Sequence, residues 1–169
     1  GLGAQVTIAD INEDMLNIGR GRAEKLVGLE LDWSLENAEQ LSFADRSFAA
    51  YSVGFGLRNV THLERALTEA NRVLQRGGRF YCLEFSTIER TGQWAGVAEI
   101  YDFYSHQIVP KIGQLIAQDE ASYRYLIESI RRFPNMQQFK AKIEAAGFIN
   151  CQIEPILGGL VAIHSGWKI

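Results

Sequence analysis

The chain has 169 residues, of which 47% are hydrophobic, and its formal net charge at pH 7 is −3. This length and this share of apolar residues predict one globular domain with its own core. Because Lys and Arg are scattered and the net charge is slightly negative, no basic surface is expected and no nucleic-acid partner is predicted.

The first half of the chain alternates between strand and helix patterns. Residues 5–10 are predicted to form a strand that ends in an acid, and a helix follows between Asn12, a favourable N-cap, and Gly28. Alternating apolar residues predict two further strands, over residues 31–35 and 48–54. The pattern is therefore strand, helix, strand, strand.

A second helix and a fourth strand follow. Thr61 and Glu64 have the spacing of a capping box, and the apolar stripe behind them predicts a helix that the glycine pair at 77–78 ends. Residues 79–85 form the next predicted strand. Strands that alternate with helices at this spacing are typical of βαβ units, so we predict an α/β fold with a Rossmann-like sheet and flanking helices.

The alternation stops after this strand. Residues 86–133 hold only helical patterns and an aromatic-rich stretch, which we expect to form a helical lid or wall over a substrate. A helix capped by Asn135 comes next, and strands over residues 148–153 and 160–164 are predicted to form an antiparallel hairpin. Residues 1–169 are therefore predicted to form a single domain that carries this insertion.

The two cysteines, Cys82 and Cys151, lie in apolar, strand-like runs. We expect both to be small buried hydrophobic residues in an intracellular protein. A structural metal site needs paired Cys or His ligands at short spacing, and because the sequence has no such pair, no metal site is predicted. No apolar stretch approaches the roughly 20 residues that a membrane-spanning helix needs.

Polar residues follow several of the predicted strands, at the edge where ligands bind in an open α/β sheet. An acid such as Asp10 can accept hydrogen bonds from a ribose diol, and an amide such as Asn37 can hold an adenine edge. Gly54 with the pair Arg58–Asn59, then Glu84, follow the later strands. Taken singly, Asp10 is as often a helix-capping acid and Asn37 can be a turn former. Together they suit an adenosine-bearing cofactor.

A nicotinamide-dinucleotide fingerprint is excluded despite the start Gly1-Leu2-Gly3. The third glycine of that motif is missing, since position 6 is Val6, and no strand precedes the motif. The acid at Asp10 also follows far sooner than the usual gap of about 20 residues.

The ordered series of motifs resembles the class I methyltransferases that C-methylate quinol rings in ubiquinone and menaquinone biosynthesis. The resemblance spans the chain and rests on Asp10-Ile11-Asn12 with Met15, Asn37-Ala38-Glu39, Phe55 to Val60, Arg72-Val73-Leu74 with Gly77-Gly78, Leu83 to Ser86, Ser122 to Leu126, and Gly159 to Lys168.

The resemblance implies S-adenosylmethionine as the cofactor. The implied contacts are Asp10 on the ribose hydroxyls and Asn37 with Ala38 around the adenine. Three more residues are implied to lie beside the cofactor, namely Ile11, Met15 and Gly54. The chain departs from the pattern at position 54, where many relatives have Ser, and at position 76, where Arg stands in place of a common Pro.

Relatives also carry, before the position of Gly1, a helical segment and a first strand with a glycine-rich loop. We therefore expect either a fragment of a longer chain or a partial gene product that does not bind cofactor. In this fold the first strand lies in mid-sheet, so its absence is expected to leave unpaired ladder groups on two neighbouring strands.

The implied reaction needs an activated quinol carbon, because an unperturbed phenol has a pKa of about 10. Arg58 stays protonated below about pH 12, so we expect it to stabilise a phenolate or orient a water molecule rather than act as a base. Asn59 can position the same oxygen, and His106 and Glu84 are the candidate general bases. The plainer alternatives are that Arg58 pairs with an acid, that Asn59 caps a turn, and that His106 is part of a packed wall.

The expected substrate is a polyprenyl quinol, and no residue chooses between ubiquinol and menaquinol precursors. The alternatives are methylation of another small aromatic or sterol-like lipid, a non-catalytic component of a quinone-biosynthetic complex, and a nucleotide-binding module without transfer chemistry. Complex partners or a homodimer are possible interpretations. The lipid tail predicts peripheral contact with the cytoplasmic face of a bacterial inner membrane or with the matrix face of a mitochondrial one.

Overall fold

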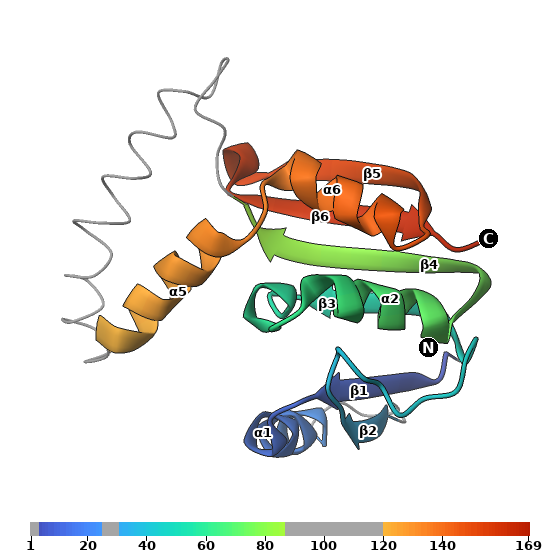
Figure 1. The fold of residues 1–169 in the computed structure, drawn as a ribbon. Helices are drawn as coiled ribbons and strands as arrows, with labels where there is room; N and C mark the ends of the chain where they lie inside the picture. The colour runs from blue at the N-terminus through green and yellow to red at the C-terminus, as the bar shows by residue number, and fades with distance from the viewer. Residues whose placement is uncertain (1–3, 25–30, 87–119) are drawn as a thin grey trace.

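The computed structural model describes residues 4–24, 31–86 and 120–169 of this α/β protein (Figure 1). Its elements in chain order are β1 (Val6–Asp10), α1 (Glu13–Ala23), β2 (Leu31–Leu35), β3 (Phe48–Gly54), the 3-10 turn η1 (Leu57–Asn59), α2 (Leu63–Val73), β4 (Leu74–Phe85), α5 (Glu120–Arg132), α6 (Met136–Ala145), β5 (Ile149–Ile156), η4 (Leu157–Gly159) and β6 (Val161–Trp167).

The strands form two hydrogen-bonded groups. β1 pairs with β2 in parallel, whereas the other sheet has the order β3-β4-β6-β5, in which β3 and β4 are parallel and β6 is antiparallel to both neighbours. Figure 1 shows the two-stranded group on the β3 side of the larger sheet. Within the described residues, β1 pairs only with β2 and β3 pairs only with β4, so each of these two strands has a ladder partner on one side only.

The core lies between the larger sheet and the helices α2 and α6. The stripe of α2 that faces the sheet is almost completely buried, at Ala66, Leu67, Ala70 and Val73. From α6 and the strands come Phe139, Ile143, Phe80 and Phe148, each at most 2% exposed. Full burial of a side chain of this size contributes about 1.5–3 kcal/mol, so this packing fixes α2 and α6 on one face of the sheet.

Two of the predicted helix starts are confirmed. Asn12 accepts hydrogen bonds from the N–H groups of Asp14 and Met15 at the start of α1. Asn135 forms a complete capping box with Gln138 at the start of α6. In both cases a short polar side chain satisfies backbone donors that the first helical turn leaves unpaired.

The predicted capping box of α2 is wrong. His62, the residue before the helix, makes no side-chain cap, and Glu64 instead pairs with Lys142 of α6 at 2.5 Å. The N–H of Thr61 donates to the carboxylate of Glu39, which lies 22 residues earlier in the chain. Glu39, which is distant in sequence, therefore accepts the hydrogen bond that was predicted for Glu64.

The ends of several elements also differ from prediction. α2 ends at Val73, and β4 begins at Leu74, so the glycine pair at 77–78 lies inside the strand region rather than at the helix end. A Cβ on Gly78 would lie 2.7 Å from the carbonyl oxygen of Gln75, which explains why this position needs glycine. The predicted hairpin is confirmed as β5–β6, and both strands run further than expected.

Parts of two predicted segments lie outside the described residues. For the insertion over residues 86–133, the described part contains the predicted helix as α5, and the aromatic stretch around residues 100–106 is not among the described residues. The same holds for Gly28, the predicted end of α1. Among the described residues, no helix is both long enough and apolar enough to cross a bilayer.

Both cysteines are free and buried, as predicted, with Cys82 1% exposed and Cys151 7% exposed. Burial raises the pKa of both thiols, because the thiolate would lose its hydration. Both side chains pack in the core cluster, which supports the interpretation that they are small hydrophobic residues.

A buried histidine of β6 makes stability depend on pH. His164 is 2% exposed, its Nε2 lies 3.0 Å from the carbonyl oxygen of Met136, and its Nδ1 has no partner among the described residues. Burial lowers the pKa of His164, although the hydrogen bond to Met136 opposes this shift. Below about pH 6.5, the ordinary pKa of histidine, the unfolded chain therefore binds more protons than the folded protein. The free energy of unfolding is expected to fall as the pH drops through this region.

Urea denaturation at a series of pH values from about 7.5 to about 5 measures this dependence. The matched variant is His164→Gln, whose amide can still donate to Met136 but does not titrate. Its stability is expected to fall less steeply over the same range than that of the wild type. Equal slopes for the two proteins would show that His164 does not cause the dependence.

Candidate active site

The turn after β1 places Asp10 at the end of the strand. One carboxylate oxygen, Oδ1, accepts a hydrogen bond from the N–H of Asn12 at 2.8 Å, and no described residue donates to Oδ2. Asn12 caps α1, so the start of the helix fixes this turn. Ile11 and Met15 are 69% and 56% exposed beside the acid. The turn thus presents one uncommitted carboxylate oxygen next to two apolar side chains.

The turn after β2 lies directly beside it. The N–H of Glu36 donates to the carbonyl oxygen of Asp10 at 2.9 Å. Asn37 is held by its own side chain, whose Oδ1 accepts the N–H of Glu39 at 2.9 Å. Ala38 packs against the core. Asp10 and the pair Asn37–Ala38, which were predicted separately, are therefore brought together at one end of the β1–β2 pair.

Glu36 anchors this second turn. Its side chain is buried and accepts hydrogen bonds from the hydroxyl of Ser34 at 2.8 Å, from the N–H of Ser42 at 2.8 Å and from the hydroxyl of Ser42 at 2.5 Å. Burial opposes ionisation, but these hydrogen bonds outweigh it and hold the pKa of Glu36 below its usual value. The ionised carboxylate therefore ties the strand end to the loop that follows.

The turn after β3 is strained at an aromatic residue. Phe55 has a φ of 57°, in the left-handed region that non-glycine residues rarely adopt. Its ring packs on Phe85 with centroids 4.8 Å apart, and its N–H donates to the carbonyl oxygen of Leu83. No described atom lies within 4 Å of the position of a Cβ on Gly54, so a serine side chain would fit there. Gly54 and Gly56 flank Phe55, and neither of them has a positive φ.

Arg58 is held in place by Glu84, the predicted residue at the end of β4. Its Nη1 lies 3.0 Å from Oε1 of Glu84, and its own N–H donates to Oε2 at 3.3 Å. Oε1 also accepts the N–H of Phe85 at 2.9 Å. The side chains of Arg58 and Glu84 are 13% and 1% exposed, so this is a buried ion pair. Arg58 therefore pairs with an acid, which was the plainer alternative predicted from the sequence.

The guanidinium of Arg58 is further fixed by the turn itself. Nη1 donates to the carbonyl oxygen of Phe55, and the group lies over the rings of Phe55 and Phe85, with its central carbon 5.9 and 5.5 Å from their centroids. A buried donor of Arg58, the N–H of Nε, has no partner among the described residues.

Asn59 is held between its own turn and α5. Its side-chain oxygen accepts the hydroxyl of Tyr125 at 3.1 Å, and its nitrogen lies 3.5 Å from the carbonyl oxygen of Phe55. Tyr125 belongs to the run Ser122 to Leu126 on which the resemblance partly rests, but no local pattern pairs it with Asn59, because the contact joins residues 66 apart. These side chains line a cavity of about 480 Å³ between η1, α2, α5 and α6.

Among the described residues, the predicted polar site residues lie at or just after the carboxyl ends of the strands β1, β2, β3 and β4. Figure 1 shows β1 and β4 with their carboxyl ends on the same side of the molecule. His106 lies outside the described residues, so its role as a base stays a prediction. Within residues 4–24, 31–86 and 120–169, no cluster of His, Cys, Asp and Glu could hold a metal ion.

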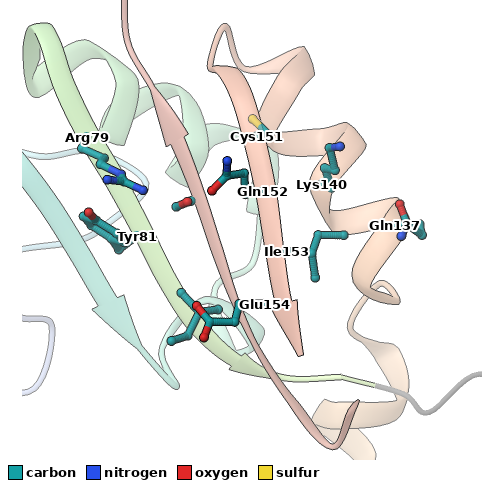
Figure 2. A pocket seen from close by; sticks show the side chains of 10 residues that line it. Arg79, Tyr81, Gln137, Lys140, Cys151, Gln152, Ile153 and Glu154 are labelled. Atoms are coloured by element: carbon teal, nitrogen blue, oxygen red, sulfur yellow. The ribbon is translucent and has the colours of Figure 1, made fainter. Parts of the chain in front are cut away.

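A second cavity, of about 460 Å³, is lined by residues of the strands β4, β5 and β6 and of the helix α6 (Figure 2). The guanidinium of Arg79 stands over the rings of Tyr81 and Trp167, 4.7 Å from each centroid. Gln152 and Lys140 add polar groups to its lining. None of the predicted site residues lines this cavity.

The sequence profile of the ubiE/COQ5 methyltransferase family matches residues 1–168. The chain belongs to this family. Membership of the ubiE/COQ5 methyltransferase family confirms the resemblance that the sequence motifs indicated.

Individual relatives agree with the ubiE/COQ5 assignment. The chain is 58% identical to the ubiquinone/menaquinone biosynthesis C-methyltransferase UbiE of Zymomonas mobilis, over 99% of this chain and 67% of that protein. It is 49% identical to the mitochondrial 2-methoxy-6-polyprenyl-1,4-benzoquinol methylase of Drosophila melanogaster, over 98% of this chain and 56% of that protein. The chain thus spans between about half and two thirds of the length of these ubiE/COQ5 relatives.

The fold is shared more widely. A SAM-dependent methyltransferase from Thermotoga maritima matches with a TM-score of 0.62 and 19% identity, over 95% of this chain and 72% of that one. At this identity the likeness shows the fold alone. It confirms that the ubiE/COQ5 chain has the predicted Rossmann-like methyltransferase architecture.

Proposed function

We propose that this protein transfers a methyl group from S-adenosylmethionine to a ring carbon of a polyprenylated benzoquinol or naphthoquinol in ubiquinone or menaquinone biosynthesis. The observation that carries the proposal is the turn after β3, where Arg58 and Asn59 are held rigidly at the same edge as Asp10 and Asn37. Membership of the ubiE/COQ5 family and the names of the relatives support the reaction class.

The residues at the β1–β2 ends fit the cofactor. Asp10 has one oxygen without a donor among the described residues, as an acceptor of ribose hydroxyls requires. Ile11 and Met15 are exposed apolar side chains that an adenosyl group would cover, and the open space at Gly54 admits the cofactor close to the backbone. Bound S-adenosylmethionine would supply an electrophilic methyl group. The task of the chain is then to align that group with the attacking carbon.

Arg58 and Glu84 are assigned different roles. Because a guanidinium is a cation and a hydrogen-bond donor without a free acceptor, Arg58 stabilises a phenolate oxygen or orients the water that takes the phenol proton. Glu84 is buried, and both of its oxygens accept hydrogen bonds from the turn. We therefore assign Glu84 to positioning Arg58 rather than to proton abstraction. Asn59, fixed by Tyr125, can hold the same substrate oxygen.

The cofactor site needs one more wall. β1 and β3 each lack a ladder partner on one side within the described residues, and buried ladder groups require partners. A parallel strand between them, from residues of the whole protein outside 1–169, would satisfy both edges. The loop after that strand would cradle the methionine part of the cofactor. The greater length of the relatives supports this assignment.

The remaining assignments concern the lipid tail and the compartment. Residues 86–133 would form the apolar wall for a polyprenyl chain, which requires a groove lined by apolar side chains. The bacterial and mitochondrial relatives are consistent with a peripheral site on a bacterial inner membrane or on the matrix face of a mitochondrial one. Association with other quinone-biosynthetic proteins, or as a homodimer, belongs to the same proposal.

The test uses the whole protein, including any residues outside 1–169, with S-adenosylmethionine that carries a labelled methyl group. Demethylated polyprenyl quinols are compared with soluble phenols and a sterol, and NMR of the product locates the methyl group. Transfer to a quinol ring carbon is expected. Transfer only to a soluble phenol or to the sterol would show that the substrate is not a polyprenyl quinol. The absence of cofactor binding in calorimetry would indicate a non-catalytic component.

A further inference from the structure

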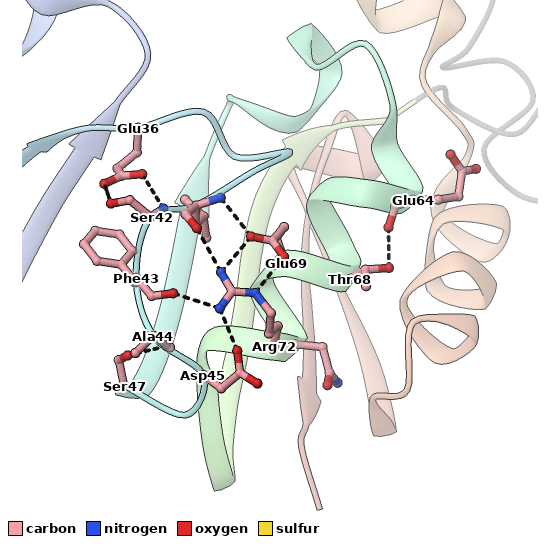
Figure 3. Close-up of polar contacts among 12 residues, drawn as sticks. Glu36, Ser42, Phe43, Ala44, Asp45, Ser47, Glu64, Thr68, Glu69 and Arg72 are labelled. Carbon is pink, nitrogen blue, oxygen red and sulfur yellow. Dashed lines mark hydrogen bonds and ion pairs between the residues drawn. The ribbon is translucent and has the colours of Figure 1, made fainter.

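The loop between β2 and β3 joins the two halves of the site. The β1–β2 pair carries Asp10 and Asn37, the larger sheet carries Arg58, and no backbone ladder connects the two groups among the described residues. The loop contacts α2 at two places instead. Near the end of the helix, Arg72 of α2 donates to carbonyl oxygens of the loop (Figure 3), and just before the start of the helix, the N–H of Thr61 donates to Glu39 of the loop.

Glu39 contacts both functional turns. Its own N–H donates to Oδ1 of Asn37 at 2.9 Å, which orients that side chain. Its Oε1 accepts the N–H of Thr61 at 2.6 Å, two residues after Asn59. Its Oε2 lies 2.8 Å from Nδ1 of His62. Glu39 therefore links the turn of Asn37, where the adenine is expected, to the turn that holds Arg58 and Asn59.

The surroundings of Glu39 favour an ionised, ordered carboxylate. The side chain is only 14% exposed, whereas His62 is 53% exposed. The hydrogen bond with His62 is the main cause that lowers the pKa of Glu39, although partial burial opposes it. The carboxylate also lies at the start of α2, where the unpaired N–H groups of the helix favour negative charge. No residue within the helix supplies this cap.

We infer that Glu39 is a positioning residue for methyl transfer, which fixes the turn of Arg58 and Asn59 relative to the turn of Asn37 and Ala38. This inference rests on the proposed function. A displacement of either turn would misalign the methyl group and the ring carbon, and misplacement by about 1 Å can cost roughly a hundredfold in rate. The carboxylate of Glu39 contacts the N–H of Thr61 and the ring of His62, so Glu39 acts through the two turns rather than by touching the substrate itself.

The test compares Glu39→Ala with Glu39→Gln, whose side-chain oxygen can still accept the N–H of Thr61. Glu39→Ala is expected to lower kcat about tenfold and to raise the KM for S-adenosylmethionine several-fold, with Glu39→Gln restoring most of both. The matched control is Asp45→Ala, which removes a carboxylate of the same loop that binds the other end of α2. It is expected to leave kcat within about twofold of the wild type.

Two readouts separate positioning from a general loss of structure. Amide hydrogen exchange at Thr61 is expected to accelerate in Glu39→Ala and not in Glu39→Gln or Asp45→Ala. In an Asn59→Ala background, Glu39→Ala is expected to cost less kcat than it does in the wild type, because one of the two groups that it positions is already absent. Equal costs in both backgrounds, or unchanged exchange at Thr61, would overturn the inference. A wild type that methylates no quinol would instead overturn the proposed function.

Discussion

Replacement of Arg58 by Ala is expected to reduce methyl transfer to the quinol by a factor of about 100 to 1,000, while the affinity for S-adenosylmethionine changes by no more than about threefold. The reason is that the side chain of Arg58 is held by Glu84, whereas the side chains expected to contact the cofactor lie at or just after the ends of β1 and β2. Single-turnover transfer of a labelled methyl group, together with calorimetry of the cofactor, measures the two quantities separately.

The same variant is expected to lose stability. Glu84 is 1% exposed, and without Arg58 its charge is left buried and unpaired, which typically costs about 3–5 kcal/mol. Arg58→Lys is the matched control, because it keeps a positive charge next to Glu84 but lacks the planar fork. It is expected to stay folded and still lose about tenfold or more in transfer. Normal turnover by Arg58→Lys and Arg58→Ala together would contradict the catalytic role.

Arg72→Met is expected to have the largest effect on stability away from the strand ends. The guanidinium donates to the carbonyl oxygens of Leu41 and Phe43 at 2.9 and 2.8 Å, and to the carboxylates of Glu69 and Asp45 (Figure 3). Loss of the two carbonyl contacts alone leaves partly buried acceptors unpaired, so a cost of about 2–4 kcal/mol is expected. For a domain of this size that corresponds to a fall in Tm of about 5–12 °C.

The control for Arg72 is Arg132→Met. Arg132 is 78% exposed and pairs with Glu128 one turn away on the same helix, an arrangement worth less than about 1 kcal/mol. Calorimetric melting of the two variants and the wild type is the measurement. If Arg72→Met melted as close to the wild type as Arg132→Met does, the loop between β2 and β3 would not depend on this residue.

Local sequence patterns predicted most of the fold. The strands β1, β2 and β3 follow from short alternating runs, and the caps Asn12 and Asn135 act within three residues of their own position. Such features depend on neighbours along the chain, which is why a sequence reveals them. The end of α2 was misplaced because Leu74, which continues the helical stripe, pairs instead with Phe48 of the neighbouring strand.

The parts of the site that were missed depend on long-range contacts. Glu84 was predicted as a strand-end acid, but its pairing with Arg58 joins residues 26 apart. Glu39 replaces the expected cap of α2, and Tyr125 reaches Asn59 from another helix. Tertiary packing brings these residues together, and no local periodicity or spacing in the sequence predicts such contacts. The strand-end rule pointed to Arg58 and Glu84 separately, but not to the ion pair between them.

Asp10 provides the most direct test that the strand ends form the cofactor site. Asp10→Asn keeps an acceptor for the N–H of Asn12, so the start of α1 is preserved, but it removes the charge and one acceptor from the expected ribose contact. Loss of a hydrogen bond to a charged group costs about 1.5–3 kcal/mol. Calorimetric titration of S-adenosylmethionine into the whole protein is expected to show a Kd raised about 10- to 100-fold, with an unchanged Tm. A Kd within about twofold of the wild type would contradict the account.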